Sequence, residues 1–206
     1  MKSSAPLLHA VTPADVLDRT DLDARAAAIA RGPKVAVHAR APGVPGRTLG
    51  ALADRLRRAT GTTGTKVFVN DRADVAMIVK ADGVHVPAAG LPIAAVRALV
   101  GPDVWIGRSV HQPEEALEAA EQGADYVFLG PIWVTASHPG RAPLGLEAIT
   151  RALPARVVAI GGVTPERIAQ CRDAGAYGVA AVSALWRAND PASVVDRMLL
   201  LLESEC

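Results

Sequence analysis

Residues 156–182 read RVVAIGGVTPERIAQCRDAGAYGVAAV and contain one complete strand–helix–strand unit. Two short apolar runs, Arg156–Ile160 and Gly178–Val182, have the composition of buried strands. Between them, Pro165–Ala174 has a helical pattern that begins with proline and is followed by Gly175, a residue that often ends a helix. A strand, a crossover helix and a second strand in this order predict two parallel neighbours in one sheet.

The same alternation of strand and helix continues from this unit toward both ends of the chain. The apolar runs that we expect as strands are Leu7–Ala10, Lys34–Ala39, Lys66–Val69, Gly83–Val86, Val104–Val110, Tyr126–Gly130, Arg156–Ile160 and Gly178–Val182. The expected helices are Asp21–Arg31, Leu49–Thr60, Ala73–Lys80, Ile93–Val100, Pro113–Gln122, Gly145–Leu153, Pro165–Ala174 and Ser193–Ser204. Eight strand–helix units predict an α/β fold, a single-domain (β/α)8 TIM barrel over residues 1–206. The alternative is an open doubly wound sheet, which usually has about five to seven strands.

Composition and charge exclude several classes of partner. The 206 residues include 22 Lys and Arg against 21 Asp and Glu, so the net charge is +1 and no basic stripe is present. Aromatic residues are only 3% of the sequence, which argues against base stacking. The two cysteines, Cys171 and Cys206, stand alone, and the N-terminus lacks a signal-peptide pattern. We expect a cytoplasmic protein that binds neither nucleic acid nor membrane, with a homodimer left open.

The ends of the last two strands predict a phosphate site. In a barrel of this kind the functional residues lie at the carboxyl ends of the strands, and phosphate is often bound after strands seven and eight. Gly161 and Gly162 follow strand seven, and their backbone N–H groups are unobstructed by a side chain. Val182 and Ser183 follow strand eight. The alternatives are that the glycines only make a tight turn and that Ser183 is an ordinary loop serine.

Polar residues on strands two, four and five are expected to reach the same end of the barrel. Successive side chains of a strand alternate in direction, so His38 and Arg40 share one face, which we assign to the lumen. His85 on strand four and Ser109 and His111 at the end of strand five are expected on the same rim. Two alternatives remain open: His38 as a core histidine and His111 as a solvated residue at a helix entry.

Two further segments carry candidate ligand-binding groups. Asn70 and Asp71, at the end of strand three, can cap the next helix, or Asp71 can hold Mg²⁺ and Arg72 an anion. The loop after strand six is the longest strand-to-helix connection, and long loops in compact domains are often functional. Its donors suit an anionic ligand, although the loop can also be a proline-stiffened lid; they are Thr135, Ser137, His138 and Arg141.

Five motifs stand in the order found in one known family. They are Val69-Asn70-Asp71-Arg72, Asp82-Gly83-Val84-His85-Val86, Ile106-Gly107-Arg108-Ser109-Val110-His111, Ala124-Asp125-Tyr126-Val127-Phe128-Leu129-Gly130-Pro131-Ile132 and Ala159-Ile160-Gly161-Gly162-Val163. Between about Lys34 and Trp186 the chain resembles the thiamine-phosphate synthase/TenI family. The resemblance implies a (β/α)8 barrel that acts on the phosphorylated thiazole half of thiamine.

The chain departs from the synthase pattern at three places. Synthases have Gln-x-Arg-x-Lys on strand two, where this chain has His38, Arg40 and Pro42. Gly90 replaces the second metal-binding aspartate, and His138 replaces a lysine of the strand-six loop. These losses concern metal and pyrophosphate, so the pattern is similar to the TenI branch, which implies a thiazole tautomerase that needs no cofactor.

We therefore expect an enzyme that moves a proton on a thiazole phosphate by histidine acid/base catalysis. The branch's histidine next to Gly130 is Pro131 here, so the candidate catalytic residues are His38, His138, His85 and His111. The candidate substrate-binding residues are Arg40, Asn70, Arg72, Ser109, Thr135 and Ser137. One alternative is a thiamine-phosphate synthase, a Mg²⁺-dependent transferase in which Asp71 holds the metal. Another is a catalytically silent binder or regulator that keeps only the phosphate site: Gly161, Gly162, Val182 and Ser183.

Overall fold

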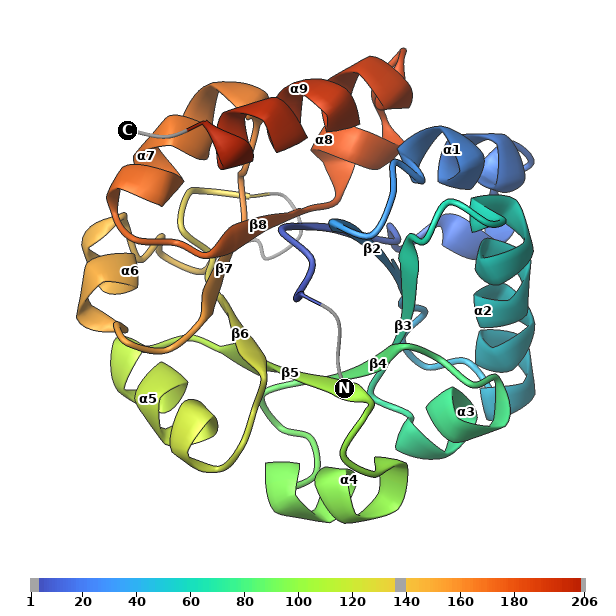
Figure 1. Cartoon of the computed structure of the whole chain (residues 1–206), viewed down its shortest axis with the longest axis horizontal. Coiled ribbons are helices and arrows are strands. Elements are labelled where there is room, and N and C mark those ends of the chain that lie inside the picture. The colour runs from blue at the N-terminus through green and yellow to red at the C-terminus, as the bar shows by residue number, and fades with distance from the viewer. Residues whose placement is uncertain (1–3, 136–139, 205–206) are drawn as a thin grey trace.

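A computed structural model describes residues 4–135 and 140–204 (Figure 1). Within these residues, parallel strands form a closed barrel in chain order, β1 to β8, and the predicted (β/α)8 fold is confirmed. Each strand pairs with the next, and β8 pairs with β1 to close the ring. The strands are β1 Leu8–Val11, β2 Val35–Ala39, β3 Lys66–Asn70, β4 Gly83–Val86, β5 Trp105–Val110, β6 Tyr126–Leu129, β7 Val157–Ile160 and β8 Gly178–Ala181.

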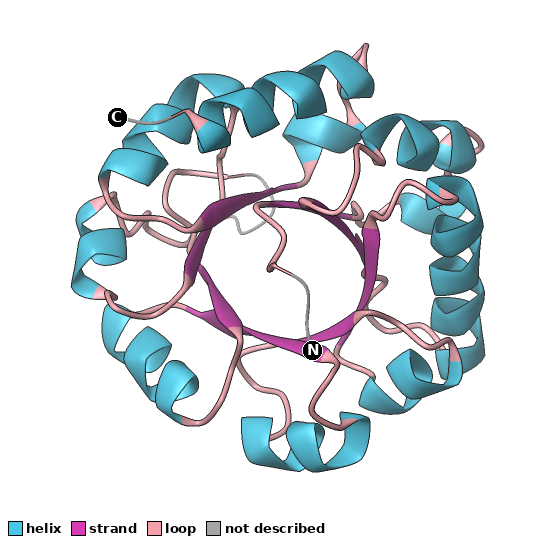
Figure 2. Cartoon of the chain, viewed as in Figure 1, coloured by secondary structure: helices cyan, strands magenta, loops and turns pink. Residues whose placement is uncertain are grey.

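Helices surround the ring of strands on the outside (Figure 2). They are η1 Val16–Asp18, α1 Leu22–Ile29, α2 Gly46–Thr60, α3 Ala73–Ile78, α4 Ile93–Val100, α5 Pro113–Glu121, α6 Glu147–Arg151, η2 Pro165–Arg167, α7 Ile168–Asp173, α8 Ser183–Trp186 and α9 Pro191–Glu203. No helix in the described residues is long and apolar enough to cross a membrane.

The helices differ from the prediction in two informative places. Helix α2 begins three residues earlier than expected, directly after Pro45, whose extended backbone precedes it. Helix α8, directly after β8, was not predicted because four residues are too short to show a helical period. It makes Ser183 the first residue of a helix rather than a loop residue.

Alternation along the strands builds two separate apolar cores. Outward-facing residues such as Val37, Val69 and Leu129 are buried beneath the helices. Inward-facing residues fill the lumen with rings, among them Phe68 and Tyr126, whose centroids lie 6.0 Å apart. The N-terminal segment lies across the ring of strands in Figure 1. Side chains fill this part of the lumen, and a cavity opens toward the carboxyl ends of the strands.

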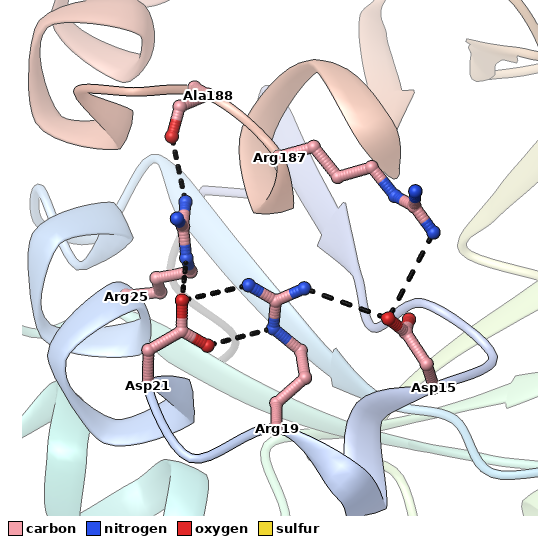
Figure 3. A network of polar contacts seen from close by, with 6 residues as sticks. All are labelled: Asp15, Arg19, Asp21, Arg25, Arg187 and Ala188. Atoms are coloured by element: carbon pink, nitrogen blue, oxygen red, sulfur yellow. Dashed lines mark hydrogen bonds and ion pairs between the residues drawn. The ribbon is translucent and has the colours of Figure 1, made fainter.

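Charged residues connect the segments that follow β1 and β8. Arg25 on α1 donates to Asp21 and, across 163 positions of sequence, to the carbonyl of Ala188 at 2.7 Å (Figure 3). Arg187 also lies 3.9 Å from the carboxylate of Asp15, in the segment that follows β1. These contacts hold α8 against the segment after β1, so the two walls of the barrel mouth are fixed relative to each other.

Candidate active site

A cavity of about 430 Å³ opens at the carboxyl ends of the strands, where the barrel fold places function. Its lining residues lie up to 172 positions apart in sequence, from Val11 to Ser183. Among the described residues, its lining contains no Asp or Glu. The lining includes most of the residues predicted from sequence, namely Arg40, Asn70, His85, Ser109, His111, Thr135, Gly161, Gly162, Val182 and Ser183.

The turn after β7 supplies free backbone donors. The N–H groups of Gly162 and Val163 have no acceptor in the described part of the chain, and neither does that of Ser183 at the start of α8. Gly161 and Gly162 have φ values of 91° and 70°, which side chains rarely tolerate. Donors converging from two neighbouring strand ends suit an oxyanion, so this phosphate cup stays our assignment for the phosphate site.

The same glycines also let the loop after β6 pack closely against β7. A Cβ on Gly162 would lie 2.8 Å from Cβ of Trp133, and the Trp133 N–H donates to the carbonyl of Gly161 at 3.1 Å. The guanidinium of Arg167 stacks over the Trp133 ring at 4.9 Å and donates to the carbonyl of Gly162. The tight-turn alternative is therefore correct as well, because the glycines are needed for packing whether or not phosphate binds.

Arg40, which follows β2, contributes a cation to the cavity lining. Its guanidinium has no hydrogen-bond or ion-pair partner in the described part of the chain, and burial lowers its pKa. Its backbone is held firmly, because Thr12 Oγ1 accepts from the Arg40 N–H at 2.8 Å and lies 2.8 Å from the Arg40 carbonyl. A half-buried guanidinium without a counter-ion is stabilised when an anion binds beside it.

Arg72 and Asp71 lie outside the cavity lining. Arg72 donates to both carboxylate oxygens of its neighbour Asp74, which raises the pKa of Arg72. The Arg72 guanidinium is therefore not free to bind substrate, contrary to the prediction from sequence. Asp71 is exposed and has a left-handed φ of 69°, held by an N–H bond of 2.9 Å to the carbonyl of His85. Aspartate tolerates this conformation better than most residues, and such positions cluster at functional sites.

His38 lies below the cavity floor, in the lumen, and both of its ring nitrogens have partners. Nε2 lies 2.9 Å from Nδ1 of His9, and Nδ1 lies 3.2 Å from Oδ1 of Asn70. Burial lowers the pKa of His38 to about 3. His9 was not singled out from sequence, although it stands between Leu8 and Ala10 and the alternation rule applied to His38 places it in the lumen too.

The remaining histidines occupy different environments. His85 lies 2.8 Å from Ser109 Oγ through Nε2 and 3.2 Å from the Tyr126 hydroxyl through Nδ1, and burial lowers its pKa well below the usual range. His111 is half-buried, and its Nδ1 lies 2.7 Å from the carbonyl of Gly130. A carbonyl only accepts, so Nδ1 of His111 carries a proton. His138 and Ser137 lie outside the described residues.

The buried histidines predict an acid-sensitive fold. His9, His38 and His85 are neutral when folded because burial lowers each pKa, whereas in the unfolded chain each titrates near about pH 6.5. Below that pH the unfolded state therefore binds more protons than the folded state. The contribution of these histidines to the free energy of unfolding is present above that pH and is lost as the pH falls. We expect urea unfolding to show a free energy that is nearly constant above about pH 7 and drops by ~3–4 kcal/mol between about pH 6 and 5. A flat profile over that range would show that these rings are not buried and neutral.

Gly90 has no room for the aspartate of the synthase pattern. A Cβ at this position would lie 2.6 Å from Val86 Cγ1 and 3.0 Å from the carbonyl oxygen of Pro87. Arg108 holds this conformation of the loop after β4 by donating to the carbonyls of Ala88 at 2.7 Å and Leu91 at 2.9 Å. The backbone conformation of this loop therefore excludes an aspartate side chain at position 90, so restoring the carboxylate would require the loop to change shape.

The oxygen donors at the cavity mouth fit a divalent cation only if the substrate also supplies ligands to it. Among residues 4–135 and 140–204, no group of three or more His, Cys, Asp or Glu is arranged to hold a metal. Asp71 is the carboxylate that follows β3 directly, and Asn70 beside it offers an amide. Mg²⁺ is often held by one or two carboxylates together with the phosphate oxygens of a substrate.

Some residues of the cavity were missed from sequence. They are Thr12, Pro13 and Ala14 after β1 and Phe128 and Ile160 in the lumen. The strand-end and alternation rules point to each of them. They carry neither a charge nor a glycine pair, the two signals that mark a strand-end site most clearly in a sequence.

A family profile described as thiamine monophosphate synthase matches residues 8–185, and these span the barrel and its mouth. The chain belongs to the thiamine monophosphate synthase family. The thiamine-phosphate synthase of Anaeromyxobacter dehalogenans is 41% identical over 161 residues, which are 75% of this chain and 72% of that protein. That of a Synechocystis species is 42% identical over 138 residues, 66% of this chain but only 40% of that protein. The chain thus spans less than half the length of this relative.

A solved structure agrees with the family. The thiamine phosphate pyrophosphorylase from Pyrococcus furiosus superposes with a TM-score of 0.82 at 29% identity, covering 96% of this chain and 95% of that one. The predicted membership of the thiamine-phosphate synthase/TenI family is confirmed.

The prediction of a thiazole tautomerase, an isomerase, is wrong. Relatives at 41% and 42% identity and the Pyrococcus structure carry synthase or pyrophosphorylase names. The structure also argues against two of the four candidate histidines. His38 and His85 are buried with lowered pKa values and have partners at both ring nitrogens, so neither is poised to exchange a proton with substrate. Arg40, which matches the arginine of the synthase pattern, lines the cavity.

Proposed function

We propose that this protein is a thiamine-phosphate synthase, a transferase that joins a pyrimidine diphosphate to a thiazole phosphate and releases pyrophosphate. The observation that carries the proposal is a cavity whose described lining lacks carboxylates and offers two separate anion-binding groups. One is the phosphate cup of Gly161, Gly162 and Ser183, and the other is the guanidinium of Arg40, which has no partner among the described residues. A reaction between two phosphorylated substrates needs two such places, whereas a tautomerase needs only one phosphate site.

For the coupling reaction, the protein has to align the two substrates and stabilise the charge of the leaving pyrophosphate. The thiazole ring nitrogen forms a bond to the methylene carbon of the pyrimidine while the carbon–oxygen bond to pyrophosphate breaks. The bonding electrons leave with pyrophosphate, and the thiazole nitrogen becomes cationic. No proton is transferred in this step, so neutral buried histidines are compatible with it. Arg40 would stabilise the negative charge that grows on the leaving group.

Mg²⁺, which the family alternative implies, would be held by Asp71 together with oxygens of the pyrophosphate. When bound, the ion neutralises part of the leaving group's charge. Asp71 would contribute its carboxylate to hold the ion, and Arg40 would stabilise the negative charge of the pyrophosphate. The left-handed backbone at Asp71, fixed by its bond to His85, supports a role for this residue at the rim.

The direct test is pyrophosphate release by the purified protein supplied with both substrates and Mg²⁺. We expect coupling, with pyrophosphate formed only when both halves are present. Absence of pyrophosphate at saturating concentrations of both, with a synthase of the family active in the same assay, would overturn the proposal. Binding of the thiazole phosphate alone would then leave the silent phosphate-ligand binder as the better description.

Pro42 offers a gain-of-function prediction. Pro42 lines the cavity two residues beyond Arg40, where the synthase pattern has lysine. Pro42→Lys should add a cation beside the leaving group and raise kcat/KM for the pyrimidine diphosphate by about tenfold, equivalent to ~1.4 kcal/mol. Pro42→Gln, which adds length without charge, is the matched control for release of the proline ring. Equal rates for the two variants would show that position 42 does not face pyrophosphate.

A further inference from the structure

The free N–H groups of the turn after β7 belong to peptide units whose carbonyls are held by other residues. The Trp133 N–H donates to the carbonyl of Gly161 at 3.1 Å, and that carbonyl shares a peptide unit with the Gly162 N–H. The guanidinium of Arg167 donates to the carbonyl of Gly162, which shares a peptide unit with the Val163 N–H. Gly162 and Val163 line the cavity, whereas Trp133 and Arg167 are not among its described lining residues.

Peptide geometry converts these contacts into a direction for the donors. A peptide unit is planar, and in the trans form found in this turn its N–H points away from its C=O. Holding the carbonyls of Gly161 and Gly162 from outside the cavity therefore aims the N–H groups of Gly162 and Val163 the opposite way. That direction is toward the cavity, where both residues contribute to the lining.

The free N–H of Ser183 is fixed in the same manner, but by backbone alone. The carbonyl of Val182, in the same peptide unit, accepts from the Trp186 N–H at 2.9 Å, and Trp186 is fully buried. Among the free donors after β7 and β8, that of Val163 is therefore the one whose peptide unit is held by a side chain, the guanidinium of Arg167. A substitution of this arginine can change one donor while the backbone contacts of the others remain.

Arg167 is itself held in one orientation. Its guanidinium stacks over the Trp133 ring, with 4.9 Å between Cζ and the ring centroid, and its backbone N–H donates to the carbonyl of Thr164 at 3.0 Å. A guanidinium presents its donors in a rigid plane, so stacking restricts where those donors point. A charged donor on a carbonyl also polarises the peptide unit, which strengthens the N–H of the same unit as a donor.

We propose that Arg167 is a positioning residue for phosphate, which holds the Gly162 carbonyl so that the Val163 N–H is aimed at a phosphate group in the cavity. The inference rests on the proposed function for the identity of the ligand, the thiazole phosphate, and it gives Arg167 no contact with that ligand. Glycine rotates easily about its backbone bonds, so without the guanidinium the Gly162–Val163 peptide unit is free to turn. The phosphate would then lose one of its donors.

The first experiment uses inorganic phosphate as the probe and follows backbone amides by nitrogen-15 NMR. In the native protein we expect phosphate to shift the amide protons of Gly162, Val163 and Ser183 downfield, because each gains a charged acceptor. Arg167→Met keeps the apolar stem without the donors, so the Val163 shift should be lost while that of Ser183 persists. A native Val163 shift in this variant, or no shift of these amides in the native protein, would overturn the proposal.

The second experiment measures how far binding depends on the phosphate group. The probes are the thiazole phosphate and the corresponding thiazole alcohol, titrated by calorimetry. Arg167→Met should reduce the preference for the phosphate about tenfold, equivalent to ~1.4 kcal/mol, as expected for one hydrogen bond to a charged group. Arg167→Lys keeps the charge and one donor, so its preference should lie between those of Arg167→Met and the native protein. A merely structural loss would weaken both compounds equally, and an unchanged preference would contradict the proposal.

Arg197→Met is the matched control. Arg197 on α9 lies 3.1 Å from the carboxylate of Glu166, the neighbour of Arg167 in sequence, and both side chains are exposed. An exposed ion pair contributes little free energy, so the preference for phosphate should change by less than about twofold. If the native protein binds neither thiazole compound, the proposed function fails, whereas the amide shifts with inorganic phosphate still decide the role of Arg167.

Discussion

Arg40→Ala should reduce kcat/KM for the coupling reaction by about 10²–10³-fold, the loss typical when one preorganised donor to a developing anion is removed. The guanidinium borders the cavity, has no partner in the described part of the chain and faces a lining without carboxylates. Its removal takes charge from the leaving pyrophosphate without breaking a protein contact. The measurement is the steady-state rate of pyrophosphate release with the pyrimidine diphosphate varied.

The matched control is another arginine next to the same rim. Arg72→Ala removes a guanidinium that is paired with Asp74 outside the cavity. Because an exposed ion pair contributes little free energy, we expect kcat/KM to change by less than about twofold. Arg40→Lys should fall between the native enzyme and Arg40→Ala, because it keeps the charge and loses the forked donors. Arg40→Ala with native kcat/KM would remove Arg40 from the mechanism.

Gly162→Val should raise the dissociation constant for the thiazole phosphate by at least about tenfold, or ~1.4 kcal/mol. Two effects act together. A side chain is strained at φ of 70°, and its Cβ would meet Cβ of Trp133 at 2.8 Å and the carbonyl of Val134 at 3.0 Å. The turn must shift, and the free N–H groups beside it then no longer converge. Calorimetry with the thiazole phosphate measures the change.

A second glycine separates binding from general strain. Gly123 also has a left-handed φ, 91°, yet nothing lies within 4 Å of its Cβ position and it is remote from the cavity. Gly123→Val should lower the free energy of unfolding by about 1–2 kcal/mol and leave phosphate affinity unchanged. If Gly162→Val and Gly123→Val bound the thiazole phosphate equally well, the phosphate would have to lie elsewhere.

The order of strands and helices was predictable because it depends on local patterns. Gly83–Val86 and Ile93–Val100 were placed correctly at both ends, and the other strands are within one residue at each end. Errors occurred where local signals are short or absent. Four residues are too few to reveal α8, and the start of α2 depends on the extended backbone at Pro45, which lies outside the periodic stretch.

The sequence by itself determined the barrel, the family and the rim on which the site would be found, because strand alternation and the strand-end rule follow from backbone geometry. Tertiary structure alone decided what each rim residue is free to do. It leaves the Arg40 guanidinium without a partner among the described residues, and it joins His38 to His9, 29 positions away in sequence. Two arginines have the same intrinsic charge and two histidines the same intrinsic pKa. Their availability for chemistry depends on which neighbours the closed barrel brings within hydrogen-bonding distance and how far it excludes water.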